Sequence, residues 1–288
     1  MKSASVPGLA PLIVNVAFTG AVSDKAGNPA VPWTIAEVMA DAIACSDAGM
    51  AMGHFHVRTE DGGATNDPER YRRLFEALRG DERTRQTVLV ASTSGRHGQT
   101  LDDRCAVLRL PEEVRPDMAS LTLSSLNFAG GASINQPDTI RALAEEMQRR
   151  DVKPELEVFD LGMIAFAHRL IDEGLLTPPY YFNIILGNVA GAQPNLATLA
   201  ALVGQLPGNS IVGLGGIGRA QHVSHLFALA EADAVRTGLE DNLRMPGGRQ
   251  LATNPALVEV IRDLVTLGGR ALETPAGLRE RLDLRRSW

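Results

Sequence analysis

Short apolar runs alternate along the chain with longer segments whose apolar residues recur at helical spacing. The first pair is LIVNVAF at 12–18, which predicts a strand, and 34–49, which predicts an amphipathic helix. The second pair is MAMGHFHV at 50–57 and a helix at 67–80, for which Asp67 is a good N-cap. Six further strands are predicted, each followed by a helical segment: 87–93, 118–123, 154–159, 180–187, 210–216 and 232–238.

This alternation also predicts how the elements assemble. Parallel neighbours need crossover connections, so strands alternating with helices predict a parallel sheet. Eight units without a break in composition favour closure, and we expect one α/β domain over 1–288, a (β/α)8 TIM barrel with a C-terminal helical extension from about 271 to 288. The alternative is an open doubly wound sheet, since Gly213, Gly215 and Gly218 fit GxGxxG. That fingerprint lies in the seventh unit, whereas dinucleotide folds normally begin with it.

Composition narrows the class of protein. Hydrophobic residues make up 44% and charged residues 22%, which is typical of a packed globular chain. The net charge of −6 comes without a long basic run, so we expect no nucleic-acid partner. No apolar run approaches the roughly 18 residues that span a membrane, and Pro7 and Pro11 favour a first strand over a signal peptide. We therefore expect no membrane partner and a cytoplasmic location, with Cys45 and Cys105 reduced and buried.

Residues that could bind a metal follow the second and eighth strands. His54 and His56 are two apart, so a strand places both imidazoles on one face, close enough to chelate one ion. Glu240 follows the eighth strand, which a closed barrel places next but one to the second. Together they predict a divalent metal site, with zinc as the expected ion. Either histidine could instead be a satisfied core or surface group, and Glu240 and Asp241 could cap the next element.

Further polar residues fall at the predicted mouth, where barrels place their functional side chains. Glu155 and Glu157 share one face of the fifth strand, so at least one points into the barrel unless both face the helices, and Arg236 is the natural partner. Other mouth candidates are Ser92, Thr93, Ser94, Ser120, Thr122 and Asn127. The remaining histidines lie in loop or helical contexts and are expected to be structural or exposed: His97, His168, His222 and His225.

Ordered motifs along nearly the whole chain resemble a known family. They include VNVAFTGAVSDKAGNPAVPWT, GHFHVRTEDGGATNDPERYR, VASTSG, PDMASLTLSSLNF, KPELEVFDLGM, LGNVAGAQPN, GLGGIGR and VRTGLEDNL. In these motifs the chain is similar to the β-keto acid cleavage enzymes. The resemblance implies a zinc-dependent barrel that converts a β-keto acid and acetyl-CoA into acetoacetate and a new acyl-CoA. It also implies a homo-oligomer, a tetramer.

The resemblance implies roles for matching residues. His54, His56 and Glu240 match the ligands of one zinc ion per subunit. The general base matches Asp241, and the residues that orient and tune it match Arg236, Ser92 and Glu157. Substrate-site positions match Ser120, Thr122 and Asn127.

Two further segments bear on the substrate. Members of the family that act on an amino-bearing keto acid carry Glu where this chain has Val22, so a neutral or apolar substrate side chain is expected here, with Phe18 and Phe55 nearby in sequence. The glycine segment 213–218, which includes Gly216, could offer backbone amides to a CoA phosphate or to the substrate carboxylate. It could equally be a plain turn.

Three other functions remain possible from the sequence. A metal-dependent hydrolase of the amidohydrolase kind also uses HxH on a barrel, but places it on the first strand and adds histidines on later strands, which this chain lacks. A non-haem iron enzyme also suits two histidines and a carboxylate. A barrel used as an interaction scaffold would hold no metal.

Overall fold

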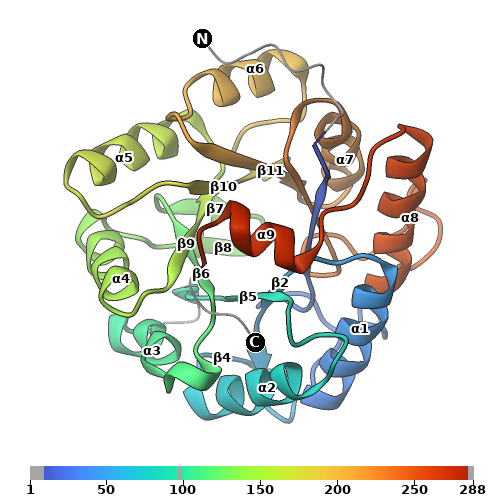
Figure 1. The fold of residues 1–288 in the computed structure, drawn as a ribbon, viewed down its shortest axis with the longest axis horizontal. Coiled ribbons are helices and arrows are strands. Elements are labelled where there is room, and N and C mark those ends of the chain that lie inside the picture. Colours follow the sequence, from blue (N-terminus) through green and yellow to red (C-terminus); the bar gives the residue numbers. More distant parts are fainter. Residues whose placement is uncertain (1–9, 97–98, 285–288) are drawn as a thin grey trace.

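Eight parallel strands form a closed barrel at the centre of the protein (Figure 1). The computed structural model describes residues 10–96 and 99–284. The barrel strands are β1 (Ile13–Ala17), β2 (Met52–Phe55), β5 (Val88–Ala91), β6 (Met118–Thr122), β9 (Lys153–Val158), β10 (Tyr180–Leu186), β11 (Ser210–Gly216) and β12 (Ala234–Thr237). Because β1 pairs with both β2 and β12, the sheet has no open edge. The predicted TIM barrel is confirmed, and the open doubly wound alternative is wrong.

Helices surround the barrel and connect its strands (Figure 1). The α-helices are α1 (Ile35–Ala48), α2 (Pro68–Gly80), α3 (Leu101–Ala106), α4 (Pro137–Arg149), α5 (Leu161–Asp172), α6 (Leu196–Gly204), α7 (Ala220–Glu231), α8 (Asn254–Leu267) and α9 (Pro275–Arg281), and the short 3-10 helices are η2 (Val107–Arg109) and η3 (Glu112–Val114). Asp67 caps α2 as predicted, accepting a hydrogen bond from the Glu69 amide. Thr34 and Glu37 form a reciprocal capping box at the start of α1.

Two short antiparallel hairpins extend from the carboxyl ends of the barrel strands. One pairs β3 (Val57–Arg58) with β4 (Ala64–Thr65), and the other pairs β7 (Leu126–Phe128) with β8 (Gly131–Ser133). The predicted strand 50–57 is therefore divided, because β2 ends at Phe55 and the chain pairs with β4 from Val57 onward. Both hairpins lie after strands that carry predicted site residues.

Side chains inside the barrel change from apolar to polar along its axis. Near the amino-terminal ends of the strands, the inner layer contains Ile13, Met52, Val88, Met118, Tyr181, Ile211 and Ala234. Two residues further along the strands, the register places Asn15 beside Arg236, and Ser120 beside Glu155. The alternate residues Val14 and Val16 pack outward in the core shared with the helices. The strands thus present polar groups inside the barrel from its middle to its carboxyl end.

Helix α9 closes the amino-terminal end of the barrel, and Figure 1 shows it across the centre of the ring. Leu278 and Leu282 are fully buried against the apolar inner layer. Arg279 donates hydrogen bonds to the carboxylate of Asp117, which precedes β6. Within the predicted C-terminal extension, α9 forms the floor of the barrel, and residues 285–288 of that extension lie outside the described residues.

Two predictions from composition concern the cysteines and membrane segments. Cys45 and Cys105 are both buried and unpaired, as predicted. Over 10–96 and 99–284, no helix combines the length and the apolar character that crossing a bilayer requires.

Candidate active site

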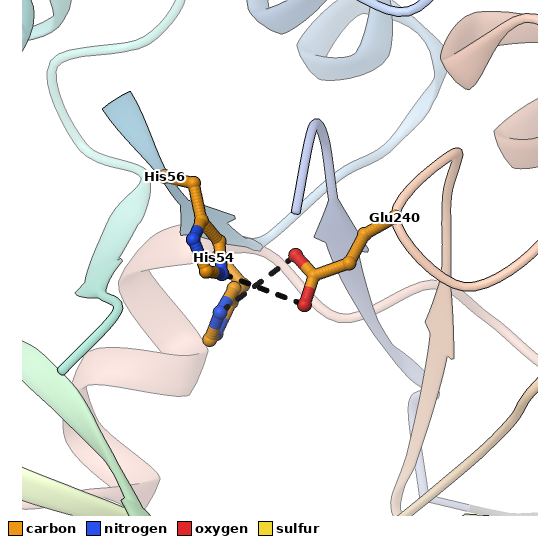
Figure 2. A group of neighbouring side chains, drawn as sticks. All are labelled: His54, His56 and Glu240. Atoms are coloured by element: carbon orange, nitrogen blue, oxygen red, sulfur yellow. Dashed lines mark ion pairs between the residues drawn. The ribbon is translucent and has the colours of Figure 1, made fainter. Parts of the chain in front are cut away.

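The three predicted metal ligands meet at the carboxyl ends of the strands (Figure 2). His54 Nε2 lies 3.8 Å from Glu240 Oε2, and His56 Nε2 lies 3.5 Å from Glu240 Oε1. Gly20 has a positive φ of 66°, and a Cβ there would lie 2.6 Å from the Glu240 side chain, so only glycine allows this approach. The Oε2 atom of Glu240 is buried without a hydrogen-bond partner in the described residues. This set of donors fits a divalent metal ion.

Inside the barrel, a buried carboxylate fixes the orientation of His54. Glu155 accepts a hydrogen bond from His54 Nδ1 at 2.7 Å, and both side chains are essentially inaccessible to solvent. The other oxygen of Glu155 accepts from Asn15 at 2.8 Å and from Asn183 at 3.1 Å. With Nδ1 donating its proton, the lone pair of His54 Nε2 faces the mouth.

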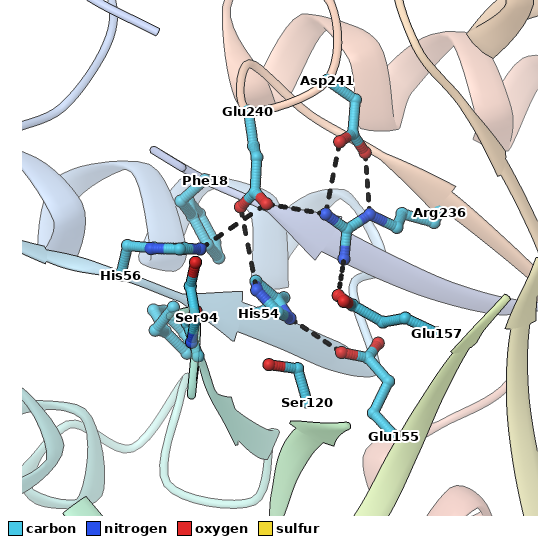
Figure 3. A network of polar contacts seen from close by, with 12 residues as sticks. Phe18, His54, His56, Ser94, Ser120, Glu155, Glu157, Arg236, Glu240 and Asp241 are labelled. Atoms are coloured by element: carbon cyan, nitrogen blue, oxygen red, sulfur yellow. Dashed lines mark hydrogen bonds and ion pairs between the residues drawn. The ribbon is translucent and has the colours of Figure 1, made fainter. Parts of the chain in front are cut away.

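Arg236 links the acidic residues of the mouth (Figure 3). Its guanidinium donates to both oxygens of Asp241, at 2.7 and 3.2 Å, and to Glu240 Oε1 at 2.8 Å. Its third nitrogen lies 3.9 Å from Glu157, which accepts a hydrogen bond from Thr122 at 2.6 Å. As predicted, Arg236 is the cation beside an inward-facing acid, but that acid is Glu157, because Glu155 pairs with His54 instead.

Burial and charge shift the pKa values of these groups in different directions. Burial raises the pKa of Glu240, but the two imidazoles and Arg236 outweigh this and hold it well below its usual range. Burial also raises the pKa of Asp241, and Arg236 offsets this only in part, so the pKa stays above its usual value. Burial lowers the pKa of His56, whereas two neighbouring carboxylates reverse the same effect and raise the pKa of His54. Adjacent acids therefore have different proton affinities.

A cavity of about 740 Å³ opens at this end of the barrel. The predicted site residues that line it are Val22, His54, His56, Ser92, Ser120, Thr122, Glu157, Arg236, Glu240 and Asp241. Ser94 also lines it, whereas the Thr93 hydroxyl turns away and donates to the carbonyl of Ser120. Phe18 and Phe55 stack on each other, fully buried, and are absent from the lining.

Two predicted substrate residues lie elsewhere. Asn127 is exposed on the β7–β8 hairpin, and its carbonyl accepts a hydrogen bond from Asn188. Gly216 packs closely against the backbone of Ala220 in α7 rather than lining the cavity. Their roles in substrate binding stay predictions.

The glycine segment after β11 makes contacts that favour a turn. The amides of Ile217 and Gly218 already donate to the carbonyls of Leu186 and Asp241. Gly215 leaves space for the side chain of Arg236, because a Cβ atom at position 215 would lie only 3.0 Å from the Cβ of Arg236. The segment thereby supports the residues on β12.

The remaining histidines are structural or exposed where the structure describes them. His225 is buried behind β12 and hydrogen-bonds the carbonyl of Arg236, and burial lowers its pKa to about 3. His168 and His222 contact the carbonyls of Gln205 and Arg244 from more exposed positions. His97 lies outside the described residues.

Sequence reasoning left several residues of this region without a function. Asn15 and Asn183 interrupt apolar strands, which was a visible signal, but their shared contact with Glu155 joins strands far apart in sequence. Arg96 lines the cavity from the segment that follows β5, and Phe128 lines it from the β7–β8 hairpin. No spacing rule relates such segments.

TIM barrel enzymes typically group buried charged side chains around an open cavity at the carboxyl ends of their strands. This chain has both the barrel and such a site, so its class is that of the TIM barrel enzymes. The family model of the beta-keto acid cleavage enzymes matches residues 11–284, so the chain belongs to that family. The protein is therefore an enzyme that cleaves β-keto acids.

Characterised relatives match almost end to end. The 3-keto-5-aminohexanoate cleavage enzyme of Fusobacterium nucleatum is 35% identical over 276 residues, 96% of this chain and 98% of the relative. The 3-oxoadipate:acetyl-CoA acetyltransferase of Cupriavidus necator is 35% identical over 279 residues, 95% of each chain. Among solved structures, apo ObcA superposes with a TM-score of 0.77 at 23% identity, covering 89% of this chain and 66% of ObcA. This last likeness supports the fold.

Proposed function

We propose that this enzyme condenses a β-keto acid with acetyl-CoA and releases acetoacetate and a new acyl-CoA. The family supports β-keto acid cleavage, and the names of two relatives, from Cupriavidus necator and Rhizobium meliloti, specify acetyl-CoA as the second substrate. The observation that carries the proposal is the position of Asp241, which lines the same cavity as the triad of His54, His56 and Glu240.

One zinc ion per subunit is the proposed cofactor, bound by His54, His56 and Glu240. Two imidazoles and a carboxylate suit zinc and leave open positions for a substrate. The buried, unpartnered Oε2 of Glu240 and the hydrogen bond that aims His54 both support a metal here. When bound, the ion would supply Lewis acidity to the ketone and carboxylate oxygens of the keto acid.

Asp241 is the proposed general base. Its carboxylate would remove a proton from C2 of the keto acid, which lies between two carbonyl groups and is therefore acidic. Arg236 holds both oxygens of Asp241 in place and places positive charge beside the developing anion. Glu157 and Ser92 line the same cavity and are proposed to orient this pair, Glu157 through its approach to Arg236.

The remaining steps conserve atoms and protons. The C2 carbanion attacks the carbonyl carbon of acetyl-CoA, and CoA thiolate leaves. The thiolate then adds to the original ketone carbon, the bond between that carbon and C2 breaks, and the protonated Asp241 returns its proton to C2. Acetoacetate and the acyl-CoA result.

The substrate is proposed to contact Ser120 and Thr122, which line the cavity beside the triad. Asn127 and Gly216 are also proposed to contribute to the substrate site. Val22 also lines the cavity and is 61% exposed, so a cationic substrate group finds no partner in that side chain.

The enzyme is proposed to act as a homo-oligomer, a tetramer. Large apolar side chains on the surface support this, since Val189 and Leu196 are each 70% exposed. Light scattering of the purified protein measures the oligomeric state directly.

A panel of β-keto acids tests the proposed function. Metal-replete enzyme is incubated with each acid and acetyl-CoA, and acetoacetate and the acyl-CoA are measured together. Equal formation of both products is expected for at least one acid. Complete inactivity across the panel would exclude the proposal, and full turnover by Asp241→Asn would exclude Asp241 as the base.

A second candidate is a non-haem iron enzyme, because the same triad suits iron(II). Metal analysis of protein purified without oxygen, together with oxygen consumption, separates the two. Iron with substrate-dependent oxygen uptake would favour the second candidate, zinc without uptake the first.

A further inference from the structure

Arg96 is a charged residue of the cavity that the proposed mechanism does not use. It follows β5 and lines the cavity together with Phe128, the last residue of β7. The central carbon of its guanidinium lies 3.6 Å from the centroid of the Phe128 ring. This cation–π contact holds the guanidinium at one place on the cavity wall, where none of the described residues accepts a hydrogen bond from its N–H groups.

The positive charge of Arg96 has no acidic partner among the described residues. The other arginine that lines the cavity, Arg236, is engaged by Asp241 and Glu240. The mouth acids attract Arg96 only at longer range, while burial lowers its pKa. A partly buried cation without a partner is costly unless an anion binds beside it.

We infer that Arg96 binds a carboxylate or phosphate group of a substrate, remote from the carbons that react. This inference rests on the proposed function, which places those carbons beside Asp241 and the triad. Arg96 touches neither, so its ligand is a different part of a substrate. A planar guanidinium matches both oxyanions in a bidentate manner. The anion is either a carboxylate at the far end of the keto acid or a phosphate of CoA.

Paired ligands, of which one member carries the carboxylate or the phosphates and the other lacks them, test the inference without any turnover. Adipate is compared with hexanoate, and CoA with pantetheine, by calorimetric titration of the wild-type protein and of Arg96→Met. Arg262→Met is the matched control, because Arg262 is exposed on α8, outside the cavity lining. Arg96→Met is expected to weaken binding of the more anionic member of one pair about 10- to 100-fold and leave its partner unchanged.

Selective loss in the first pair identifies a distal carboxylate, and selective loss in the second identifies a CoA phosphate. Arg96→Lys keeps the charge and should retain part of the selectivity, and Phe128→Leu, which removes the ring beneath the guanidinium, should reduce it by a smaller factor. Equal weakening of both members of each pair, or no change in either pair, would overturn the inference.

Turnover provides an independent arm. The wild-type enzyme and Arg96→Met are assayed with 3-oxoadipate and 3-oxohexanoate, which differ only in the terminal carboxylate. If neither acid nor any other in the panel gives acetoacetate, the proposed function fails, while the binding result still decides whether Arg96 is an anion site.

Discussion

The two ends of the barrel both bury charged side chains, but they satisfy them differently. At the amino-terminal end, Asp117 accepts hydrogen bonds from Arg79 and Arg279 and from the amide of Leu89. At the carboxyl end, one nitrogen of Arg236 and one oxygen of Glu240 are buried without a hydrogen-bond partner in the described part of the chain. At the first end both oxygens of the buried carboxylate accept hydrogen bonds from the protein, while at the second end one carboxylate oxygen is available to a ligand.

This difference separates stability from function. A buried charge with all its partners fixes neighbouring elements, here the floor helix α9 against β5 and β6. A cluster with unsatisfied atoms gives up part of that stabilisation for binding and catalysis, and in this barrel it lies at the carboxyl ends of the strands, where barrel enzymes have their active sites. Removing one carboxylate from each end should therefore have opposite consequences.

The largest effect is expected for Asp241→Asn at the mouth. The amide preserves size but cannot accept the C2 proton, so kcat/KM should fall about 10³-fold. The free energy of unfolding should change by less than about 1 kcal/mol, because Arg236 keeps Glu240 as a partner. Steady-state kinetics and urea unfolding measure both. A large loss of stability with turnover retained would contradict the comparison.

Asp117→Asn at the floor should show the reverse. It leaves Arg79 and Arg279 buried without their full counter-charge, so the free energy of unfolding should fall by about 3 kcal/mol. The folded fraction should retain the wild-type kcat, since the floor lies at the other end of the barrel. A drop in kcat measured well below the unfolding midpoint would show that the two ends are coupled.

Glu155→Gln tests the layer between the two ends. The amide removes the negative charge that orients His54, and affinity for zinc, measured by competition with a chromogenic chelator, should fall about 10- to 100-fold. Chelation of the wild-type enzyme should abolish turnover, and added zinc should restore it. Unchanged affinity in Glu155→Gln would show that His54 is positioned by packing alone.

The smallest effect is expected for His225, which is buried beside the mouth but satisfied by a backbone carbonyl. Its pKa is about 3 in the folded protein, against about 6.5 when unfolded. The unfolded state thus binds the extra proton below pH 6.5, and stability is lost as the pH falls, by about 2 kcal/mol between pH 7 and pH 5. His225→Gln should remove this part of the pH dependence in urea unfolding. If the pH dependence of stability were unchanged in His225→Gln, other titratable groups would be responsible for it.

The fold followed from the sequence because each strand and helix carries its own periodicity. The triad was also predictable. The HxH spacing places both histidines on one face of a strand, and the order of strands in a closed barrel brings Glu240 near them. The partner of Glu155 was not predictable, because His54, Asn15 and Asn183 reach it from three other strands. Arg96 was missed for a related reason: its setting depends on Phe128, which a hairpin brings to it. Contacts between loops depend on three-dimensional packing that no periodicity encodes.

The floor helix α9 also has a consequence for synthesis of the chain on the ribosome. Arg279 contacts Asp117 across 162 residues of sequence, and Leu278 and Leu282 cover apolar residues contributed by nearly every strand. Until α9 has emerged, the inner apolar layer of the growing chain stays open to water and to other nascent chains. Completion of this barrel must therefore come late in translation, and a ribosome that stalls before α9 releases a product prone to aggregation.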